Sequence, residues 1–358
     1  MLTLFDVRTS KLEAKSMNRK ATLVAGTLLI AVFVAQAAQA RRWGCWIQAD
    51  RNVRIRNTAS NATAAVNDWN NLTILNLSSV SSGEETYVFN ANSGNTGWGG
   101  LASITNYSGC TILRATAQLN TYYSWTANAA RGVHCQEVGH TFGLDHSNDG
   151  GCMGGGYWYD IGTHYTIVSS NVNEINSMYA NKSSDHPIVG PEAGAPRFHA
   201  FWVNHPHSLR EATRMSTEVV VATAYDVTEG AVIETVDPDG NVQRIPTERV
   251  HFTVKSSKKG VLSPGESFVL FQNGNHDNRF DEDPSYKLGH RYILFLSARE
   301  DGTYMVISPE GRYEVTRRGL VPVVEKGFAG ELKGASLNDV TADVERAVAD
   351  IEREPLEQ

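Results

Sequence analysis

Five residues between positions 136 and 146 are spaced for a helix that ends in a sharp turn. They are Gln136, Glu137, His140, Gly143 and His146. In a helix, residues 136 and 140 lie one turn apart and project from the same face. Gly143 can adopt the backbone conformation that ends a helix, after which the chain can fold back. His146 would then approach His140, so this stretch predicts a helix whose end gathers three side chains.

The types of these side chains predict a catalytic metal site. Three protein ligands and one open position characterise catalytic zinc sites, and imidazole is a preferred zinc ligand. The side-chain oxygen of Gln136 can take the place of an imidazole, although it is a poorer donor for zinc. We therefore expect one Zn²⁺ held by Gln136, His140 and His146. Glu137 lies beside this face, and we expect it to act as the catalytic general base on a metal-bound water.

The same stretch resembles the signature of the metzincin metalloproteases, and of their matrixin-like bacterial branch in particular. That signature is H-E-x-x-H-x-x-G-x-x-H followed by a methionine turn. Four residues match it in order and spacing: Glu137, His140, Gly143 and His146. Met153 stands at the place of the methionine turn, where it would form an apolar floor under the ligands, whereas Gln136 replaces the first histidine. The resemblance covers roughly residues 43–182.

The resemblance implies a fold and an activity. The fold is a metzincin-like catalytic domain with a twisted sheet, an active-site helix, a methionine turn and a closing helix. The activity is that of a secreted zinc-dependent endopeptidase, which hydrolyses peptide bonds of a protein or peptide substrate through a metal-activated water.

The glutamine at position 136 leaves other functions open. A chain that keeps the fold but has lost zinc through Gln136 would be a catalytically inactive binding protein. A metal-dependent hydrolase acting on something other than peptides is a further alternative. His134 is a poor replacement ligand, because six residues before His140 it lies about 120° away around the helix. Asp145 is one residue short of the ligand position, so we expect it to support a ligand.

The composition of the chain changes midway, which predicts two domains of an α+β protein. The 358 residues are enough for two domains. Residues 41–187 are poor in charge and include the metzincin-like domain, and a linker containing Gly and Pro follows at 188–196. Short β-type runs separated by turns predict a small β-barrel or sandwich at 197–325. An acidic tail with an amphipathic helix ends the chain at 326–358.

Periodicity predicts the elements that surround the active-site helix. Helices are expected at 60–70, 127–143 and 170–179, and strands at 73–77, 85–89 and 111–118. A glycine-rich segment at 97–101 is either a loop or an edge strand that pairs with an extended peptide substrate.

The first residues predict export. Arg19 and Lys20 precede an apolar run at 21–35, which ends in Ala38-Gln39-Ala40. This pattern is typical of a secretory signal peptide, here residues 1–40. The run is shorter than the ~20 residues that span a bilayer, so we expect no stable membrane insertion after cleavage. The protein would be secreted, or periplasmic in a Gram-negative bacterium.

Four cysteines remain after that cleavage: Cys45, Cys110, Cys135 and Cys152. An even number in an exported chain predicts two disulfides, and four cysteines allow three pairings. Cys135 precedes the first ligand position and Cys152 precedes Met153, so a bond between them would fasten the helix to the turn. We therefore favour Cys135–Cys152 and Cys45–Cys110, with free buried thiols as the alternative.

The remaining signals concern partners and further ions. The formal net charge of −7 argues against a nucleic-acid partner, which usually requires a basic face. The acidic run at 277–283 lacks the spacing of an EF-hand, so Ca²⁺ is possible but unsupported. His199, His205 and His207 have no further ligand near them in the sequence, so we expect them at the surface. The sequence leaves the oligomeric state open.

Overall fold

The computed structural model describes residues 42–147, 150–154, 164–182, 197–325 and 327–354. The expected signal peptide at 1–40 and the expected linker at 188–196 lie outside these residues. The fold is mixed α+β, as predicted, with about 25% helix and 38% strand. The described residues belong to one compact unit, Ala40–Gln358, and the expected domain limits stay predictions.

The first sheet has seven strands, ordered β3-β2-β4-β6-β5-β7, and β1 pairs with β6 beside this path. Strands β1, β2, β3, β4 and β6 pair in parallel, whereas β5 is antiparallel to both of its neighbours. The bounds are β1 (Ile47–Gln48), β2 (Asn52–Asn57), β3 (Asn76–Ser79), β4 (Thr86–Ala91), β5 (Trp98–Ser108), β6 (Thr111–Asn120) and β7 (Arg197–Trp202).

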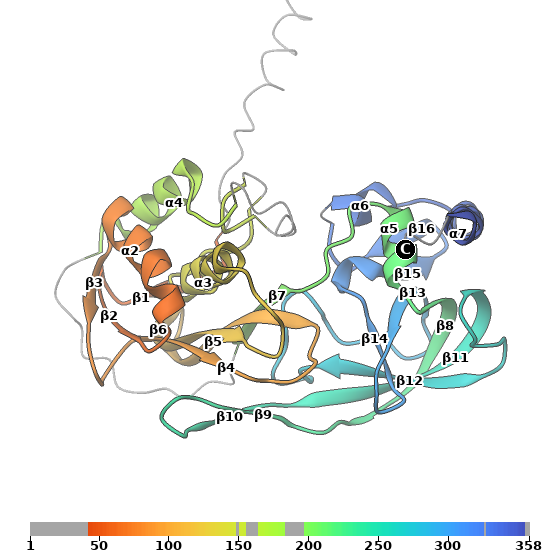
Figure 1. The fold of residues 1–358 in the computed structure, drawn as a ribbon, viewed down its shortest axis with the longest axis horizontal. Coiled ribbons are helices and arrows are strands. Elements are labelled where there is room, and N and C mark those ends of the chain that lie inside the picture. The colour runs from red at the N-terminus through yellow and green to blue at the C-terminus, as the bar shows by residue number, and fades with distance from the viewer. Residues whose placement is uncertain (1–41, 148–149, 155–163, 183–196, 326, 355–358) are drawn as a thin grey trace, which may run out of the picture. The chain divides into compact units, whose positions relative to one another are not determined.

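Strand β5 is not an edge strand. It pairs with β6 on one side and with β7 on the other, so the expectation that residues 97–101 offer a free edge to a substrate is wrong. The partner β7 lies beyond the expected linker and was expected in the second domain. The strand instead extends the first sheet (Figure 1).

Three helices lie on one face of this sheet (Figure 1). They are α2 (Thr63–Leu72), which follows the short helix η1 (Ser60–Ala62), α3 (Ala127–Thr141) and α4 (Ser169–Tyr179). The Thr126 hydroxyl caps α3 by accepting a hydrogen bond from the Ala129 amide. Large buried side chains fill the space between these helices and the sheet, among them Trp69, Val133, Phe142 and Tyr179. The helix with the candidate ligands is therefore fixed from several sides.

The second sheet contains a closed set of five strands. Its order is β14-β12-β11-β8-β13-β15-β16, and β14 also pairs with β13, which closes the ring. The bounds are β8 (Glu218–Glu229), β11 (Thr247–Lys259), β12 (Ser267–Asn273), β13 (Arg291–Ala298), β14 (Tyr304–Val306), β15 (Arg312–Thr316) and β16 (Gly319–Pro322). A separate hairpin joins β9 (Ile233–Val236) to β10 (Val242–Ile245).

Short helices and one long helix pack beside this sheet. The elements are α5 (Leu209–Met215), η2 (Pro309–Gly311), α6 (Gly327–Glu331) and α7 (Leu337–Arg353). The Ser336 hydroxyl caps α7 by accepting from the Asp339 amide. Val340 and Val344 of α7 are buried against Phe295 and Phe328, so its apolar stripe docks within this chain.

Both favoured disulfides are present, Cys45–Cys110 and Cys135–Cys152. The first joins the segment before β1 to the start of β6, and the second fastens α3 to the turn before Met153. Among the described residues, no helix is both long enough and apolar enough to cross a membrane.

Candidate metal centre

Two predicted ligands lie one turn apart on α3. Gln136 and His140 are both completely buried. The Nδ1 atom of His140 hydrogen-bonds the carbonyl oxygen of Leu144 at 2.7 Å. Because a carbonyl oxygen only accepts, this bond places the proton on Nδ1 and leaves Nε2 as the donor atom for a metal.

The helix ends at Thr141, two residues before its predicted end, and the chain then reverses. Gly143 has φ +91°, and a Cβ atom there would collide with the carbonyl oxygen of Trp46. Glycine is therefore required both by the conformation and by the close approach. The reversal places the His146 ring 5.0 Å from the His140 ring, measured between centroids. The Nε2 atoms of Gln136 and His146 are in contact.

The three predicted ligands thus lie together. The Gln136 oxygen is buried and accepts no hydrogen bond from the described residues, so a half-turn of the amide would present it to His146 and a shared ion.

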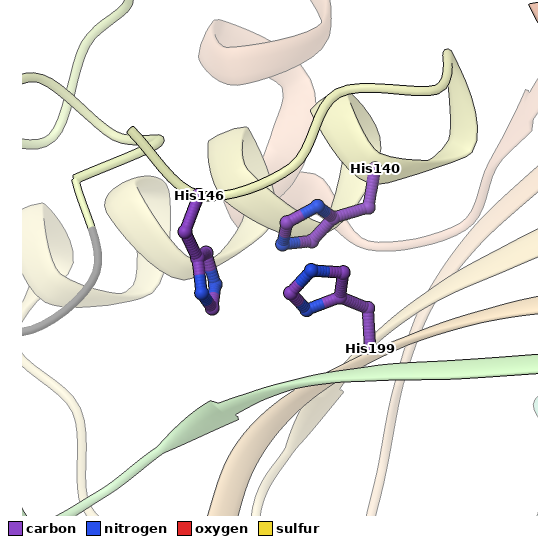
Figure 2. Close-up of side chains that lie close together, drawn as sticks. All are labelled: His140, His146 and His199. Atoms are coloured by element: carbon purple, nitrogen blue, oxygen red, sulfur yellow. The ribbon is translucent and has the colours of Figure 1, made fainter. Parts of the chain in front are cut away.

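A fourth side chain, His199 of β7, completes the group (Figure 2). Its ring stacks on His140 at 3.8 Å and lies 4.4 Å from the His146 ring, between centroids. One ligand atom from each of the three histidines lies within 4.8 Å of the others. The expectation that His199 lies at the surface is wrong, since only 2% of it is exposed.

Pairing between distant strands explains why the sequence did not reveal His199. The residue enters the site because β7 pairs with β5, and that pairing has no local signal. Within residues 197–202 the side chains point to alternate faces of the sheet. Phe198, Ala200 and Trp202 lie on one face, and His199 and Phe201 lie on the other. A histidine inside so apolar a strand is a signal of burial. Of its sequence neighbours, His205 is also buried, whereas His207 is exposed.

Two carboxylates hold the His199 ring. Its Nε2 lies 3.0 Å from Asp145 Oδ1, and its Nδ1 contacts Glu282 Oε1. Burial lowers the pKa of His199, but Glu282 and Asp145 outweigh it and raise the pKa to about 10. Both ring nitrogens therefore face carboxylates, and a metal ion that binds His199 must displace a proton and one of these carboxylates from the ring. Carboxylates beside a ligating imidazole orient the ring and increase its basicity.

Glu137 lies between α3 and β5. A Cβ atom at Gly100 of β5 would collide with its Oε1, so glycine permits this close approach. The carboxyl is completely buried, and burial raises its pKa well above the usual value. The charge of His199 and the backbone amides of Phe201 and Ala102 act in the opposite direction. Glu137 thus lies against Gly100 of β5, where burial has the largest effect on its carboxyl.

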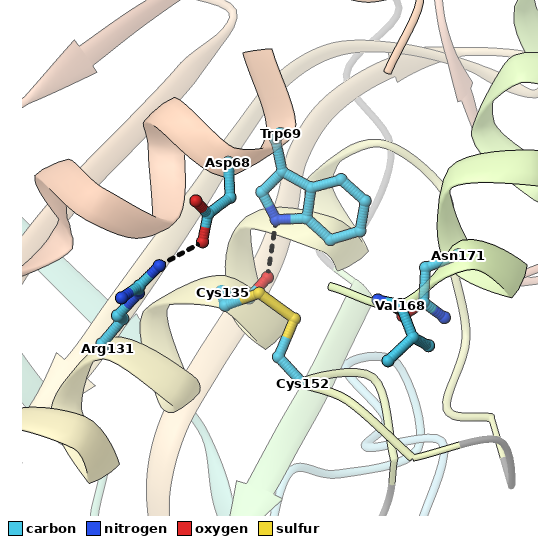
Figure 3. Close-up of a disulfide and its surroundings, with 7 residues drawn as sticks. All are labelled: Asp68, Trp69, Arg131, Cys135, Cys152, Val168 and Asn171. Atoms are coloured by element: carbon cyan, nitrogen blue, oxygen red, sulfur yellow. Dashed lines mark hydrogen bonds and ion pairs between the residues drawn. A yellow bond between two sulfur atoms is a disulfide. The ribbon is translucent and has the colours of Figure 1, made fainter. Parts of the chain in front are cut away.

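Met153 packs on α3 next to the ligands. A Cβ atom at Gly139 would lie 2.5 Å from the Met153 sulfur. Met153 therefore contacts α3 at Gly139, the residue that precedes His140 in the sequence. The disulfide Cys135–Cys152 fastens this turn to the helix (Figure 3), and the Trp69 indole donates to the Cys135 carbonyl at 2.9 Å. The turn therefore packs on the face of α3 that Cys135 and Gly139 form, next to the face that carries Gln136 and His140.

The other candidates lie outside this group. The Nε2 atom of His134 is 2.9 Å from Asn90 Oδ1, and burial lowers the pKa of His134 to about 3. In the acidic run, Asp281 accepts from Trp43, Glu282 contacts His199, and Asp283 pairs with Arg312. These three acids have separate partners and do not gather around a common ion, which leaves Ca²⁺ without support.

A small cavity of about 50 Å³ adjoins the group, against the 10–15 Å³ that holds one water. Its lining includes His146, Trp202, His205, Glu282 and Glu310. Water molecules fit there, but a polypeptide does not. No substrate-sized opening reaches the buried ligands through this cavity.

The donor set suits zinc. Imidazole nitrogens with a neutral oxygen donor favour Zn²⁺ over Mg²⁺ or Ca²⁺, which prefer all-oxygen sites. The buried amide oxygen of Gln136, which accepts no hydrogen bond, would gain a partner in such an ion. No protein-family model matches the chain, and no curated protein is significantly similar to it in sequence. The chemistry of the site must therefore be derived from its own residues.

Proposed function

We propose that the protein is a secreted zinc-dependent endopeptidase. The observation that carries this proposal is the convergence of His140, His146 and His199 in one buried group, with the carboxyl of Glu137 next to it. Bound zinc lowers the pKa of water towards ~7 and polarises a carbonyl group. The residues of the chain then have to hold the ligands, move a proton and position the peptide.

Glu137 would move the proton. It takes a proton from the attacking water and returns it to the leaving amine, as a general base and then a general acid. Burial raises the pKa of this carboxyl, which helps it to keep the proton between the two steps. Its place against Gly100 and α3 restricts the side chain to one orientation.

Hydrogen-bond partners would fix the ligands. The Leu144 carbonyl orients His140, and Glu282 and Asp145 orient His199. The order of Glu137, His140, Gly143 and His146, followed by Met153 against α3, supports a metzincin-like domain of the matrixin-like branch. The two disulfides suit an oxidising compartment outside the cytosol.

One observation favours a second function, that of an inactive binding protein. Glu137 and Gln136 are wholly buried in this structure, so neither can touch a substrate without a movement of the chain. A zinc ion bound for structural purposes alone would explain the same cluster.

Zinc titration of the purified chain tests whether the protein binds zinc at the assigned site, on which the proposal depends. Full-length protein should bind about one zinc ion, and the double variant His140→Ala/His146→Ala should lose it, because one imidazole and one amide oxygen are too few to hold the ion. His207→Ala replaces an exposed histidine and should bind zinc like the unaltered chain. Equal zinc binding by the double variant His140→Ala/His146→Ala would exclude the assigned site.

A further inference from the structure

The strand β7 occupies the edge of β5 beside the candidate catalytic groups. The paired residues are Leu101 with Ala200 and Ala102 with His199. An extended peptide that adds to a sheet makes the same main-chain hydrogen bonds to an exposed edge. Gly100, which touches Glu137, belongs to this part of β5. A segment of the chain itself therefore lies where a peptide could pair beside the general base.

The other face of β7 is anchored by residues near the second sheet. Phe198 stacks on Phe280 with 5.1 Å between ring centroids, and the two residues form an isolated bridge. Trp202 and Ala200 share this apolar cluster with Ile245. On the face of β7 that carries the site, Glu282 contacts the His199 ring. The anchor thus consists of an apolar cluster and one ion pair.

The position of His199 also matters for the metal site. Gln136, His140 and His146 supply three donors, and His199 brings the number of candidate donors to four. Zinc sites with four protein ligands are typically structural, whereas catalytic sites keep a position open for water. With β7 in place, Glu137 and His140 have no exposed surface and His199 has 2%. The observed arrangement is closed to a polypeptide substrate.

We propose that β7 is an inhibitory strand built into this chain. It occupies the peptide-binding edge of β5, and His199 fills the position that water needs beside Gln136, His140 and His146. Release of β7 exposes the edge of β5 and frees the water position at the metal at the same time. An extended peptide then pairs with β5 in place of β7. The proposal rests on the zinc-dependent function above and adds the way in which that site is regulated.

Two single variants test this inference in the full-length protein. His199→Ala removes the fourth donor, and Glu282→Gln weakens the anchor while it keeps the ring. His207→Ala is the matched control. Three quantities are measured for each: zinc per chain, amide hydrogen exchange in residues 98–104, and cleavage of reduced, unfolded casein. Should His199→Ala fail to fold, Glu282→Gln supplies the same comparison.

The inference predicts that both variants keep about one zinc ion per chain. Exchange in residues 98–104 should become about tenfold faster, and casein cleavage should rise by about tenfold or more. Loss of zinc from His199→Ala would overturn the inference, because His199 would then be a permanent ligand, while the metal site itself would stand. Retained zinc with unchanged exchange and cleavage would also overturn it. Absence of zinc from the unaltered chain would defeat the proposed function and this inference with it.

Discussion

At the scale of single residues, Glu137 and Gln136 decide what the site can do. Glu137 is the one carboxyl that α3 directs between the ligands and β5, and its pKa is raised by burial. Gln136 stands where a histidine would be the stronger donor. The sequence could predict the positions of both residues beside the histidines, because these positions depend only on helical spacing. It could not predict the third imidazole, because His199 reaches the group through a partner strand that is distant in the sequence.

Replacement of Glu137 separates chemistry from metal binding. In a Glu282→Gln background, Glu137→Gln should leave zinc bound and lower casein cleavage by about 100-fold or more, because the proton acceptor is removed. The measurements are zinc content and initial rates. Cleavage that continues at the background rate would show that another group, or no group, serves as the base.

The variant Gln136→His should bind zinc more tightly. An imidazole is a better zinc donor than an amide oxygen, so we expect a decrease in Kd of about tenfold, or about 1.4 kcal/mol. Competition with a chelator of known affinity measures this change, and His207→Ala serves as the control. An unchanged or weaker affinity would show that residue 136 does not face the ion.

At the scale of elements, covalent links and glycine contacts fix α3 against its surroundings. The Cys135–Cys152 bond joins the helix to the turn that carries Met153, and Gly139 lets that methionine approach. The pairing followed from the sequence because Cys135 adjoins the first predicted ligand position and Cys152 adjoins Met153. The expected end of α3 at residue 143 was two residues late, since Phe142 and Gly143 form the turn itself.

Removal of the two disulfides should have unequal effects on stability. The bonds span 17 and 65 residues, and loop-closure entropy gives about 3 and about 4 kcal/mol of unfolding free energy, respectively. Urea unfolding of Cys135→Ser/Cys152→Ser and of Cys45→Ser/Cys110→Ser measures these values. Only the first variant should also weaken zinc binding, because it frees α3 from the methionine turn. Equal zinc affinities in both variants would contradict that role.

At the scale of the molecule, segments from both sides of the expected linker build one site. The first sheet takes β7 as a strand, Trp43 donates to Asp281, and Asn273 donates to the Thr96 carbonyl at 2.9 Å. The change from a charge-poor to a charge-rich segment predicted a domain limit, but composition carries no information on strand pairing. We expected residues beyond 196 to form a domain separate from residues 41–187. Composition could not reveal these contacts, because they depend on strand pairing.

The buried pair Arg312–Asp283 should stabilise this arrangement as a whole. The two groups lie 2.8 Å apart, almost without exposure, and Arg312 also lies over the Tyr286 ring. Arg312→Ala should lower the free energy of unfolding by about 3–5 kcal/mol, because an unpaired charge stays buried at Asp283. Burial already raises the pKa of Asp283, and Arg312 lowers it. The variant should therefore lose less stability at pH 5 than at pH 8, since a protonated Asp283 carries no charge. A pH-independent loss in urea unfolding would contradict this explanation.

The zinc K-edge X-ray absorption spectrum of the loaded protein tests the metal centre most directly, because multiple scattering counts imidazole ligands. We expect three imidazoles in the unaltered chain, from His140, His146 and His199, and two in His199→Ala with the zinc still bound. The same imidazole count in both proteins, or the absence of bound zinc from the unaltered chain, would contradict the account.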